Sequence, residues 1–352
     1  MPFPARRPAG LRRVGALVAL AVTLTAAAGC GSTGLTDADP SIVRTTTMVA
    51  GAGVVGLERD TRTACPAPAP MDPGASTRNV AHAGGATTVT GDPMRIVVLG
   101  TQALDTTCAL GLWERVVGAT LPPGASAQPS YLGTGIGLIP SVGSPSAPDL
   151  DRIAQLKPDL ILGTSVPDAA VAAKLSAIAP TVFDSVDGGW QRQFQVAALA
   201  LGRPEAAKKA LADYHRDATQ TGTDLNASQT QASVVRFGGD SMQVQGSDSF
   251  AGQVLSDAGV RRPAYQRGKS YPITSSDLSN ADGDLIYVLF DGDAGKSHAE
   301  QVMNGDAWRE LGAAVDRRVF NVDDTIWHGD GLTAARAMLA DLRATLNGFV
   351  TG

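Results

Sequence analysis

Residues 144–162 read SPSAPDLDRIAQLKPDLIL, and residues 273–291 read ITSSDLSNADGDLIYVLFD. Each stretch carries an acidic residue suited to a helix start, a turn or two with apolar residues at helical steps, and a break at Pro-Asp or Gly-Asp. Each then ends in a run of branched apolar residues typical of a buried strand. The chain therefore contains one helix-into-strand unit twice, which predicts two similar α/β halves.

The same alternation continues around the first copy. RIVVLG at 95–100 is a fully apolar strand, followed at once by an amphipathic helix over 101–113 that Thr101 could cap. Further strands are predicted at 116–120, 159–165 and 181–186, and further helices at 149–156 and 168–178. Such alternation predicts a parallel sheet with helices on both faces, in a first lobe over 85–187.

The alternation restarts in the last third of the chain, which predicts a second lobe over 230–352. Strands are expected at 232–238, 242–246, 284–290 and 317–323, and helices at 249–259, 298–311 and 332–349.

Residues 188–229 connect the two predicted lobes. Pro204 suits the first turn of a helix, and Ala207, Leu211, Tyr214 and Ala218 fall on one face at helical steps. A helix from 204 to about 224 would span roughly 30 Å. The predicted fold is α/β, with two Rossmann-like lobes joined by a single long helix and a ligand cleft between them.

The N-terminus predicts export. Four arginines precede an apolar stretch over 14–28, which is too short for a membrane span, so residues 1–29 are interpreted as a signal peptide. Ala27-Ala28-Gly29-Cys30 resembles a bacterial lipobox, and lipidation of Cys30 would hold the protein on the outer face of the cytoplasmic membrane. Plain secretion after cleavage at Ala26-Ala27-Ala28 is the alternative. Residues 30–84 are then a lipid tether and extension.

Two cysteines remain after Cys30. Because an even pair in an exported protein indicates a disulfide, Cys65 and Cys108 are predicted to be bonded. Closing this loop would stabilise the fold by on the order of 4 kcal/mol.

The segment GAGVVG at 51–56 matches a dinucleotide-binding fingerprint, which needs a helix directly after the glycines. The segment PAPAP follows closely and ends any such helix. The fingerprint is therefore interpreted as accidental.

Composition excludes several functions. The net charge is −5, with 29 basic and 34 acidic residues spread singly, which does not favour a nucleic-acid partner. The sequence contains no G-x-S-x-G, Walker or H-E-x-x-H motif, so we expect no enzyme. With only 4 histidines, two of them placed outside the cleft, we expect no direct metal site and no bound cofactor.

Taken in order, these segments resemble the binding proteins of ABC importers for iron-siderophores, haem and cobalamin. The segments are RIVVLG, VGSPSAPDLDRIAQLKPDLILG, LGRPEAA, SFAGQVLSDAGV and RVFNVDDTIWHGDGLTAARAMLADL. The pattern is most similar to the FecB-like siderophore-binding lipoproteins of actinobacteria. The resemblance implies that the ligand binds in a cleft between two lobes and that the lobes close on it only slightly. It also implies a monomeric protein that delivers the ligand to a membrane permease.

The ligand site is expected at the carboxyl ends of the strands. Arg236 should face the cleft at the end of a strand, and aromatic walls would suit a large ferric chelate. Surface placement of Arg236 and core packing of each aromatic side chain are the alternatives. The candidate ligand-binding residues are Thr101, Gln102, Tyr131, Ser165, Trp190, Arg236, Tyr271, Phe290, Trp327 and His328.

The resemblance also implies one exposed acid on each lobe for docking to the permease. The matching position of the first lobe is Asp151, whereas that of the second lobe is Ser276, with Asp277 one residue later. A helix-capping role is the alternative for both acids.

The resulting hypothesis is a binder of a ferric siderophore, specifically a carboxymycobactin-like one. Haem or cobalamin is the nearest variant, and His328 or Tyr271 could supply an axial ligand to haem. An envelope interaction protein that has lost transport is a further alternative.

Overall fold

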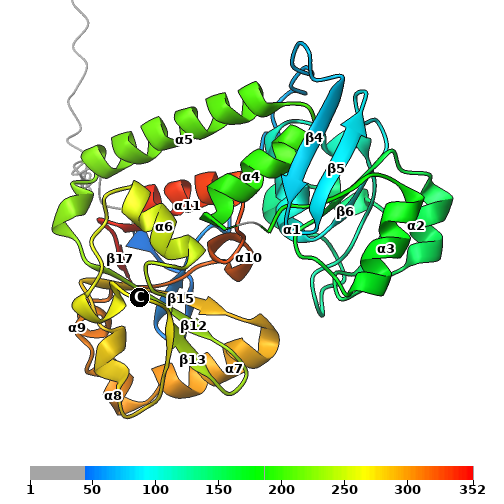
Figure 1. Cartoon of the computed structure of the whole chain (residues 1–352). Coiled ribbons are helices and arrows are strands. Elements are labelled where there is room, and N and C mark those ends of the chain that lie inside the picture. Colours follow the sequence, from blue (N-terminus) through cyan, green and yellow to red (C-terminus); the bar gives the residue numbers. More distant parts are fainter. Residues whose placement is uncertain (1–43, 186, 352) are drawn as a thin grey trace, which may run out of the picture. The chain divides into compact units, whose positions relative to one another are not determined.

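The computed structural model describes residues 44–185 and 187–351 (Figure 1). The signal peptide and Cys30 lie outside this part of the chain. The two larger sheets of the described chain, of 4 and 7 strands, belong to two α/β lobes, and the long helix α5 (Pro204–Asp224) connects these lobes in sequence. The predicted fold class is confirmed.

The first lobe is built on a parallel sheet in the order β11-β10-β6-β7. Its strands are β6 (Ile96–Leu99), β7 (Val116–Ala119), β10 (Leu160–Gly163) and β11 (Thr181–Phe183). Because helices cover both faces, the central strands are apolar throughout and fully buried. These helices are α1 (Thr101–Ala109), α2 (Leu150–Leu156), α3 (Ala169–Ile178) and α4 (Gly189–Ala200).

The second lobe has a mixed sheet in the order β14-β13-β12-β15-β16-β3-β2. Strands β12 (Ala232–Phe237), β15 (Leu285–Phe290) and β16 (Val319–Asn321) run parallel. The predicted strand at 242–246 instead folds back at Gly238-Gly239-Asp240 as β13 (Met242–Val244), antiparallel to β12, and β14 (Tyr271–Ile273) continues this hairpin. Its helices are α6 (Phe250–Asp257), α7 (Gly292–Met303), α8 (Asp306–Arg309), α9 (Gly312–Val315), α10 (Asp324–Trp327) and α11 (Leu332–Thr345).

The two copies of the helix-into-strand unit differ in their helices. In the first copy, Asp149 caps α2 by accepting from the backbone N–H of Arg152 at 3.0 Å. In the second copy, the Asp277 carboxylate accepts from the backbone N–H and the hydroxyl of Thr274, at 2.7 and 2.6 Å. Because that carboxylate closes the preceding turn, only a single 3-10 turn, η6 (Leu278–Ala281), follows it.

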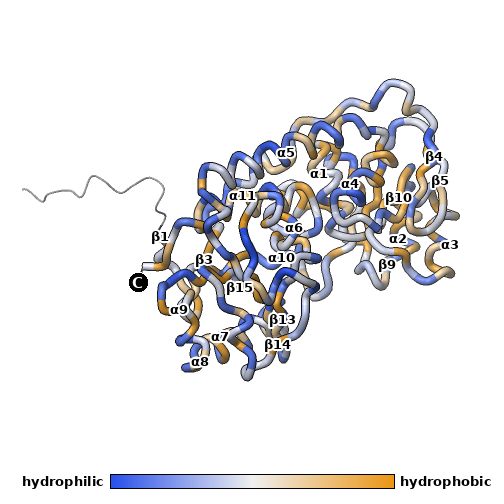
Figure 2. The backbone as a smooth tube through the Cα atoms, turned by 60° about the vertical axis from the view of Figure 1, so that its left-hand side comes forward, coloured by the Kyte–Doolittle hydropathy of each residue, from blue (hydrophilic) through white to orange (hydrophobic). Residues whose placement is uncertain are grey.

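Helix α5 has the predicted bounds and the predicted buried face of Ala207, Leu211, Tyr214 and Ala218. It packs against α4, α6 and α11. No side chain of its own caps its start. Instead, Asp72 of the extension accepts from the backbone N–H of Glu205 at 2.7 Å. The helix is mostly hydrophilic in colour in Figure 2, in contrast to the hydrophobic sheets.

The extension before Ile96 is more regular than the sequence suggests. Strand β1 (Arg44–Thr45) pairs with β17 (Phe349–Val350) at the C-terminus, and β2 (Met48–Val49) and β3 (Ala52–Val54) complete the second sheet. No described helix begins before Thr101, so the glycines at 51–56 lack the helix that a dinucleotide site requires.

The extension then reaches the first lobe. Cys65 is bonded to Cys108 of α1, as predicted, and β4 (Thr77–His82) forms a hairpin with β5 (Gly85–Thr90) that packs on α4 and β11. The extension is thus a second connection between the lobes, beside α5. Across residues 44–185 and 187–351, no helix has both the length and the apolar character needed to cross a membrane.

Candidate functional site

A cavity of about 810 Å³ opens where the carboxyl ends of strands from both lobes meet. This is the usual ligand location in open α/β sheets, and the volume lies in the range of small-molecule sites. The first lobe contributes Thr101 after β6 and a loop after β7. The second lobe contributes the ends of β12, β15 and β16 together with α10.

The wall from the first lobe is almost entirely apolar. Apart from Thr101, it consists of Pro122, Pro123, Gly124, Ala125, Ala127 and Pro129. Gln128 anchors this proline-rich loop because its side-chain amide donates to the carbonyl of Thr120 at 3.0 Å. The prolines fix the backbone, so the wall is held in place with few polar atoms to offer a ligand.

The wall from the second lobe is charged. Arg236 donates from Nε and Nη2 to the two carboxylate oxygens of Asp324, at 2.6 and 3.0 Å, and its Nη2 lies 3.2 Å from Oδ2 of Asp291. Its side chain is 22% exposed. These bonds, above all those to Asp324, raise the pKa of Arg236 against the opposing effect of desolvation. The predicted cleft-facing arginine is therefore present but already paired.

The short helix α10 and its flanking residues form part of the second-lobe wall of the cavity. Asp323 accepts from the backbone N–H and the hydroxyl of Thr325, at 2.9 and 2.7 Å, which fixes the helix start. At its other end His328 is exposed and lines the cavity, whereas Trp327 is buried and donates from Nε1 to Asp341 at 2.9 Å.

Four of the ten predicted ligand-binding residues line the cavity, namely Thr101, Arg236, Phe290 and His328. The structure places the other six outside the lining. Gln102 is buried and bonded to Gln193, Ser165 is exposed, and Tyr271 is half-buried on the outer strand β14.

Tyr131, Trp190 and Trp327 are core residues. Trp190 packs edge-on against Tyr214 and Phe250, with ring centroids 5.3 and 5.8 Å apart. These large side chains gain more by filling the interior beneath the loops than by facing water. The sequence predicted aromatic cavity walls, but of the predicted aromatic side chains only that of Phe290 lines the cavity.

Three acids of the lining, Asp291, Asp323 and Asp324, were not among the sequence candidates. The signal was available, because Asp291 directly follows β15 in LFD and the other two acids lie two and three residues after β16 in NVDD. These aspartates lie near the carboxyl ends of strands, as Phe290 and Trp327 do, and this position made Phe290 and Trp327 candidates.

The candidate docking residues lie on the surface. Asp151 is exposed in the first turn of α2, where Asp149 is the cap, so a capping role for Asp151 is wrong. Asp277 also caps no helix, since its carboxylate is bonded to Thr274. Ser276 is exposed, and its hydroxyl lies 2.8 Å from that of Thr274.

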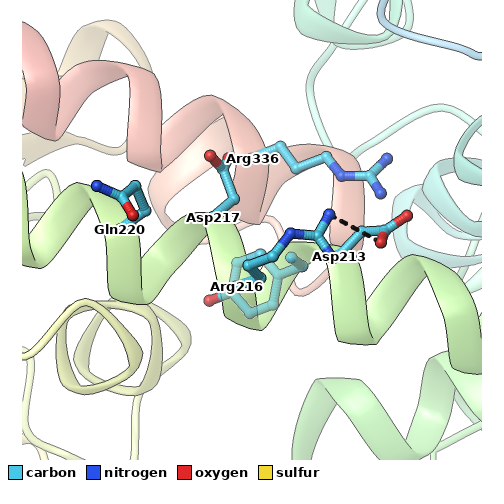
Figure 3. A pocket seen from close by; sticks show the side chains of 6 residues that line it. Asp213, Arg216, Asp217, Gln220 and Arg336 are labelled. Carbon is cyan, nitrogen blue, oxygen red and sulfur yellow. Dashed lines mark hydrogen bonds and ion pairs between the residues drawn. The ribbon is translucent and has the colours of Figure 1, made fainter.

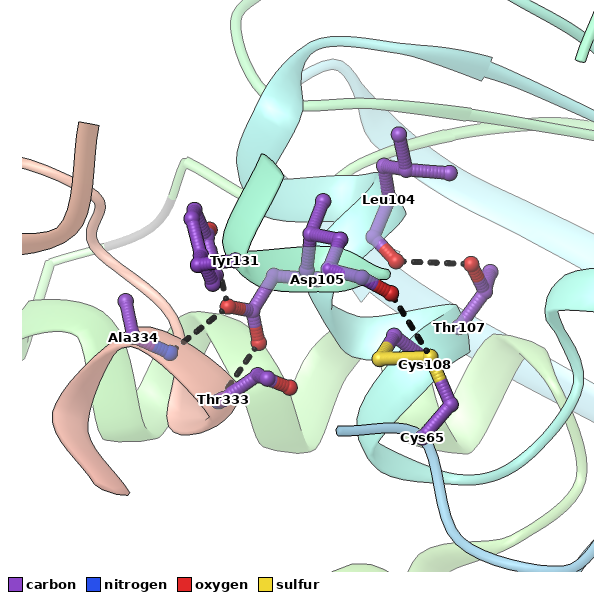
Figure 4. The surroundings of a disulfide bond; sticks show 9 residues. Cys65, Leu104, Asp105, Thr107, Cys108, Tyr131, Thr333 and Ala334 are labelled. Carbon is purple, nitrogen blue, oxygen red and sulfur yellow. Dashed lines mark hydrogen bonds between the residues drawn. A yellow bond between two sulfur atoms is a disulfide. The ribbon is translucent and has the colours of Figure 1, made fainter. Parts of the chain in front are cut away.

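A buried carboxylate links α1 of the first lobe to the start of α11 (Figure 4). Asp105 of α1 accepts from the backbone N–H groups of Thr333 and Ala334 at the start of α11, at 2.8 and 3.0 Å, and from the hydroxyl of Tyr131 at 3.0 Å. Burial raises the pKa of Asp105 despite these bonds. One turn further along α1, Cys108 carries the disulfide.

A second cavity, of about 410 Å³, lies between α5 and α11 (Figure 3). Its charged side chains already have protein partners: Asp213 accepts from Arg216 at 2.9 Å, and Arg336 donates to the carbonyl of Ala210 at 3.4 Å. It lies along helix sides, away from the carboxyl ends of the strands, so the cavity between the lobes is the candidate site. Among the described residues, no group of three or more His, Cys, Asp or Glu side chains could hold a metal ion.

Comparison with known proteins places this geometry in a family. A profile of the periplasmic binding protein family matches residues 96–325. A "probable siderophore-binding lipoprotein", YfiY of Bacillus subtilis, is 30% identical over 283 residues, which are 76% of this chain and 86% of the relative. The Fe(3+)-citrate-binding protein YfmC of the same organism is 26% identical, over 69% of this chain and 77% of the relative.

Among solved structures, SirA of Staphylococcus aureus complexed with staphyloferrin B has a TM-score of 0.67 and 26% identity. The match covers 77% of this chain and 99% of SirA. The family match over residues 96–325 includes the parallel strands of the first sheet, α5 and most of the cavity lining.

Proposed function

The chain belongs to the periplasmic binding protein family, and on that premise we propose that it binds a ferric siderophore in the cavity between its lobes for delivery to an ABC permease. Relatives named for siderophore or ferric citrate binding support this ligand class. The protein acts as a carrier, with no catalytic step of its own.

The observation that carries the proposal is the position and size of the cavity. About 810 Å³ at the carboxyl ends of two sheets, between lobes held by a rigid helix, suits a compact chelate of several hundred daltons. The sheet ends supply polar contacts while the proline-rich loop supplies an apolar wall.

Tryptophan fluorescence tests the proposal directly. Trp327 lies beside the cavity residue His328, so a ferric siderophore bound there should quench its emission. We expect saturable quenching in the wild type and weaker binding of a neutral chelate in Arg236→Ala, because Asp324 and Asp291 lose the shared partner that holds this wall in place. Absence of saturable binding for every ferric siderophore class would refute the proposed function.

The specific ligand we propose is carboxymycobactin-like in that it combines an iron-binding core of no net charge with an apolar portion, while a free carboxylate elsewhere on the chelate should weaken its binding to this cavity. The apolar loop from Pro122 to Pro129 supports an amphiphilic ligand. Mass spectrometry of small molecules released from protein purified under iron limitation should detect such a chelate. Recovery of a purely hydrophilic chelate would contradict this part of the proposal.

Haem is the second candidate ligand, because His328 lines the cavity and could supply an axial ligand. Tyr271, the other candidate axial ligand, lies outside the lining. A shift of the Soret band on titration with haem, abolished by His328→Ala, would establish this alternative, whereas an unchanged band would exclude it. Cobalamin would be recognised by its own absorption in the same titration.

For the cellular setting, we propose export as a monomer and attachment through a lipid on Cys30 at the outer face of the cytoplasmic membrane. Lipoprotein relatives support this localisation. Permease docking through Asp151 belongs to the same proposal. A protein that had lost transport and served only envelope interactions would bind no permease.

A further inference from the structure

We infer that the cavity selects ferric chelates of zero or positive net charge and discriminates against polyanionic ones. This inference rests on the proposed function, because it specifies the ligand class of the same cavity. The charges that line the cavity, the partners of Arg236 and the scarcity of aromatic side chains in the lining support this selectivity.

The lining has an excess of negative charge. Among the described residues that line it, Arg236 is the one permanent cation, and three carboxylates are present, those of Asp291, Asp323 and Asp324. With His328 counted as neutral, two negative charges are left uncompensated. The first-lobe wall contains no charged residue that could offset them.

Arg236 is also committed to protein partners. Its Nε and Nη2 form a two-bond contact with Asp324, and Nη2 additionally reaches Asp291. Such bidentate pairs are among the stronger hydrogen-bonded contacts in proteins. An anionic ligand would have to displace a carboxylate from Arg236, or approach only Nη1 with uncompensated aspartates nearby.

The lining also offers little to the aromatic rings of a tris-catecholate. Within residues 44–185 and 187–351, Phe290 is the only Phe, Tyr or Trp in the lining. By contrast, the prolines and alanines of the first-lobe wall suit aliphatic linkers, which gain by burial without hydrogen bonds. A chelate built on hydroxamates, which is neutral when three of them bind ferric iron, meets both walls without an electrostatic penalty.

One chelate scaffold with three different charges gives a sharp test. Ferrioxamine B carries an ammonium group, its N-acetyl derivative is neutral, and its N-succinyl derivative carries a carboxylate, while the iron-binding groups stay the same. Ferric enterobactin, a trianionic tris-catecholate, completes the set. Dissociation constants would be measured by isothermal titration calorimetry with the full exported chain at low and moderate salt.

We expect the cationic and neutral chelates to bind at least about tenfold more tightly than the succinylated one, corresponding to about 1.4 kcal/mol. Ferric enterobactin should bind more weakly still. The difference should shrink as salt is added, because the cavity is open to solvent and its charges are screened.

The double variant Asp291→Asn/Asp323→Asn removes two of the three carboxylate charges and leaves the lining without net charge. Asn can still cap α10 at position 323, so the fold of this wall should be retained. We expect the preference among the three charge forms to disappear. The matched control, Asp306→Asn/Asp316→Asn, removes two exposed charges of the same lobe outside the cavity lining and should retain the wild-type preference.

The outcomes separate this inference from the proposed function. Tighter binding of the succinylated chelate or of ferric enterobactin would overturn the charge selectivity while leaving the carrier function intact. Equal binding of all charge forms by the wild type would do the same. If no ferric chelate bound at all, the proposed function itself would fail, and this inference with it.

Discussion

Arg59 comes from the N-terminal extension, yet its guanidinium is paired with the buried carboxylate of Asp341 on α11 and also donates to the carbonyl of Ala337 at 3.2 Å. The side chains are 17% and 3% exposed. Asp341 in turn accepts from Nε1 of Trp327, next to the cavity. The pair thus ties the extension to the floor of the binding site.

We predict that Arg59→Ala lowers the free energy of unfolding by about 3 kcal/mol, because removing one partner leaves a buried charge uncompensated. Urea denaturation followed by circular dichroism would measure the loss. Arg62→Ala is the matched control, because Arg62 forms an exposed pair with Asp60 at 2.7 Å and should leave stability unchanged. Equal effects of the two substitutions would contradict this account.

Asp184 follows β11 and is 1% exposed, and neither carboxylate oxygen has a hydrogen-bond partner within the described chain. Burial raises its pKa well above the ordinary range. The folded state therefore binds this proton more tightly than the unfolded state. The stability that the group contributes is present below about pH 4 and is lost as the pH rises through the raised pKa.

We predict that Asp184→Asn removes this dependence, so that the variant gains stability relative to the wild type between pH 4 and pH 8. Denaturation midpoints at several pH values would show the difference. Asp168→Asn is the control, because Asp168 is an exposed cap of α3 and Asn caps equally well. A constant difference between wild type and Asp184→Asn across this range would refute the prediction.

The sequence determined local elements well and non-local contacts poorly. The bounds of α5 follow from Pro204 and a regular apolar face, both local signals. The Asp72 cap of α5 and the addition of β3 to the second sheet depend on partners more than a hundred residues away. Likewise, the sequence predicts a strand at 242–246 but does not reveal that this strand folds back antiparallel to β12.

The same limit explains the candidate site. The strand ends that carry Thr101, Arg236 and Phe290 could be located from the sequence, and these residues do line the cavity. Trp190 and Trp327 occupy similar positions in the sequence, but the direction of a side chain after a strand depends on the loop geometry. No local pattern indicates whether such a ring turns into the core or into the cleft.

Helix α2 separates two acids with different expected roles. Asp149 is the cap, whereas Asp151 projects from the first turn and is exposed. If Asp151 contacts the permease, Asp151→Ala should weaken co-purification with the permease without loss of stability. Asp149→Ala should cost about 1 kcal/mol of stability and leave docking intact. Normal docking of Asp151→Ala would remove this residue from the proposed interface.

Two connections and one buried carboxylate hold the lobes of the molecule. Helix α5 is the first connection, and the extension from β3 to the disulfide on α1 is the second. Asp105 links α1 to the start of α11. Because a continuous helix resists bending and the extension limits separation, ligand binding should close the cavity by only a small rotation.

We predict that X-ray scattering profiles of the wild type with and without a bound ferric siderophore superimpose within error. In Cys65→Ser/Cys108→Ser the extension loses its covalent attachment to α1, and the unfolding free energy should fall by about 4 kcal/mol in the chain-entropy model. The ligand-free variant should scatter with a larger radius of gyration and become more compact on binding. A ligand-dependent change as large in the wild type as in this variant would show that the extension does not restrain the lobes, leaving α5 and Asp105 as the elements that set their separation.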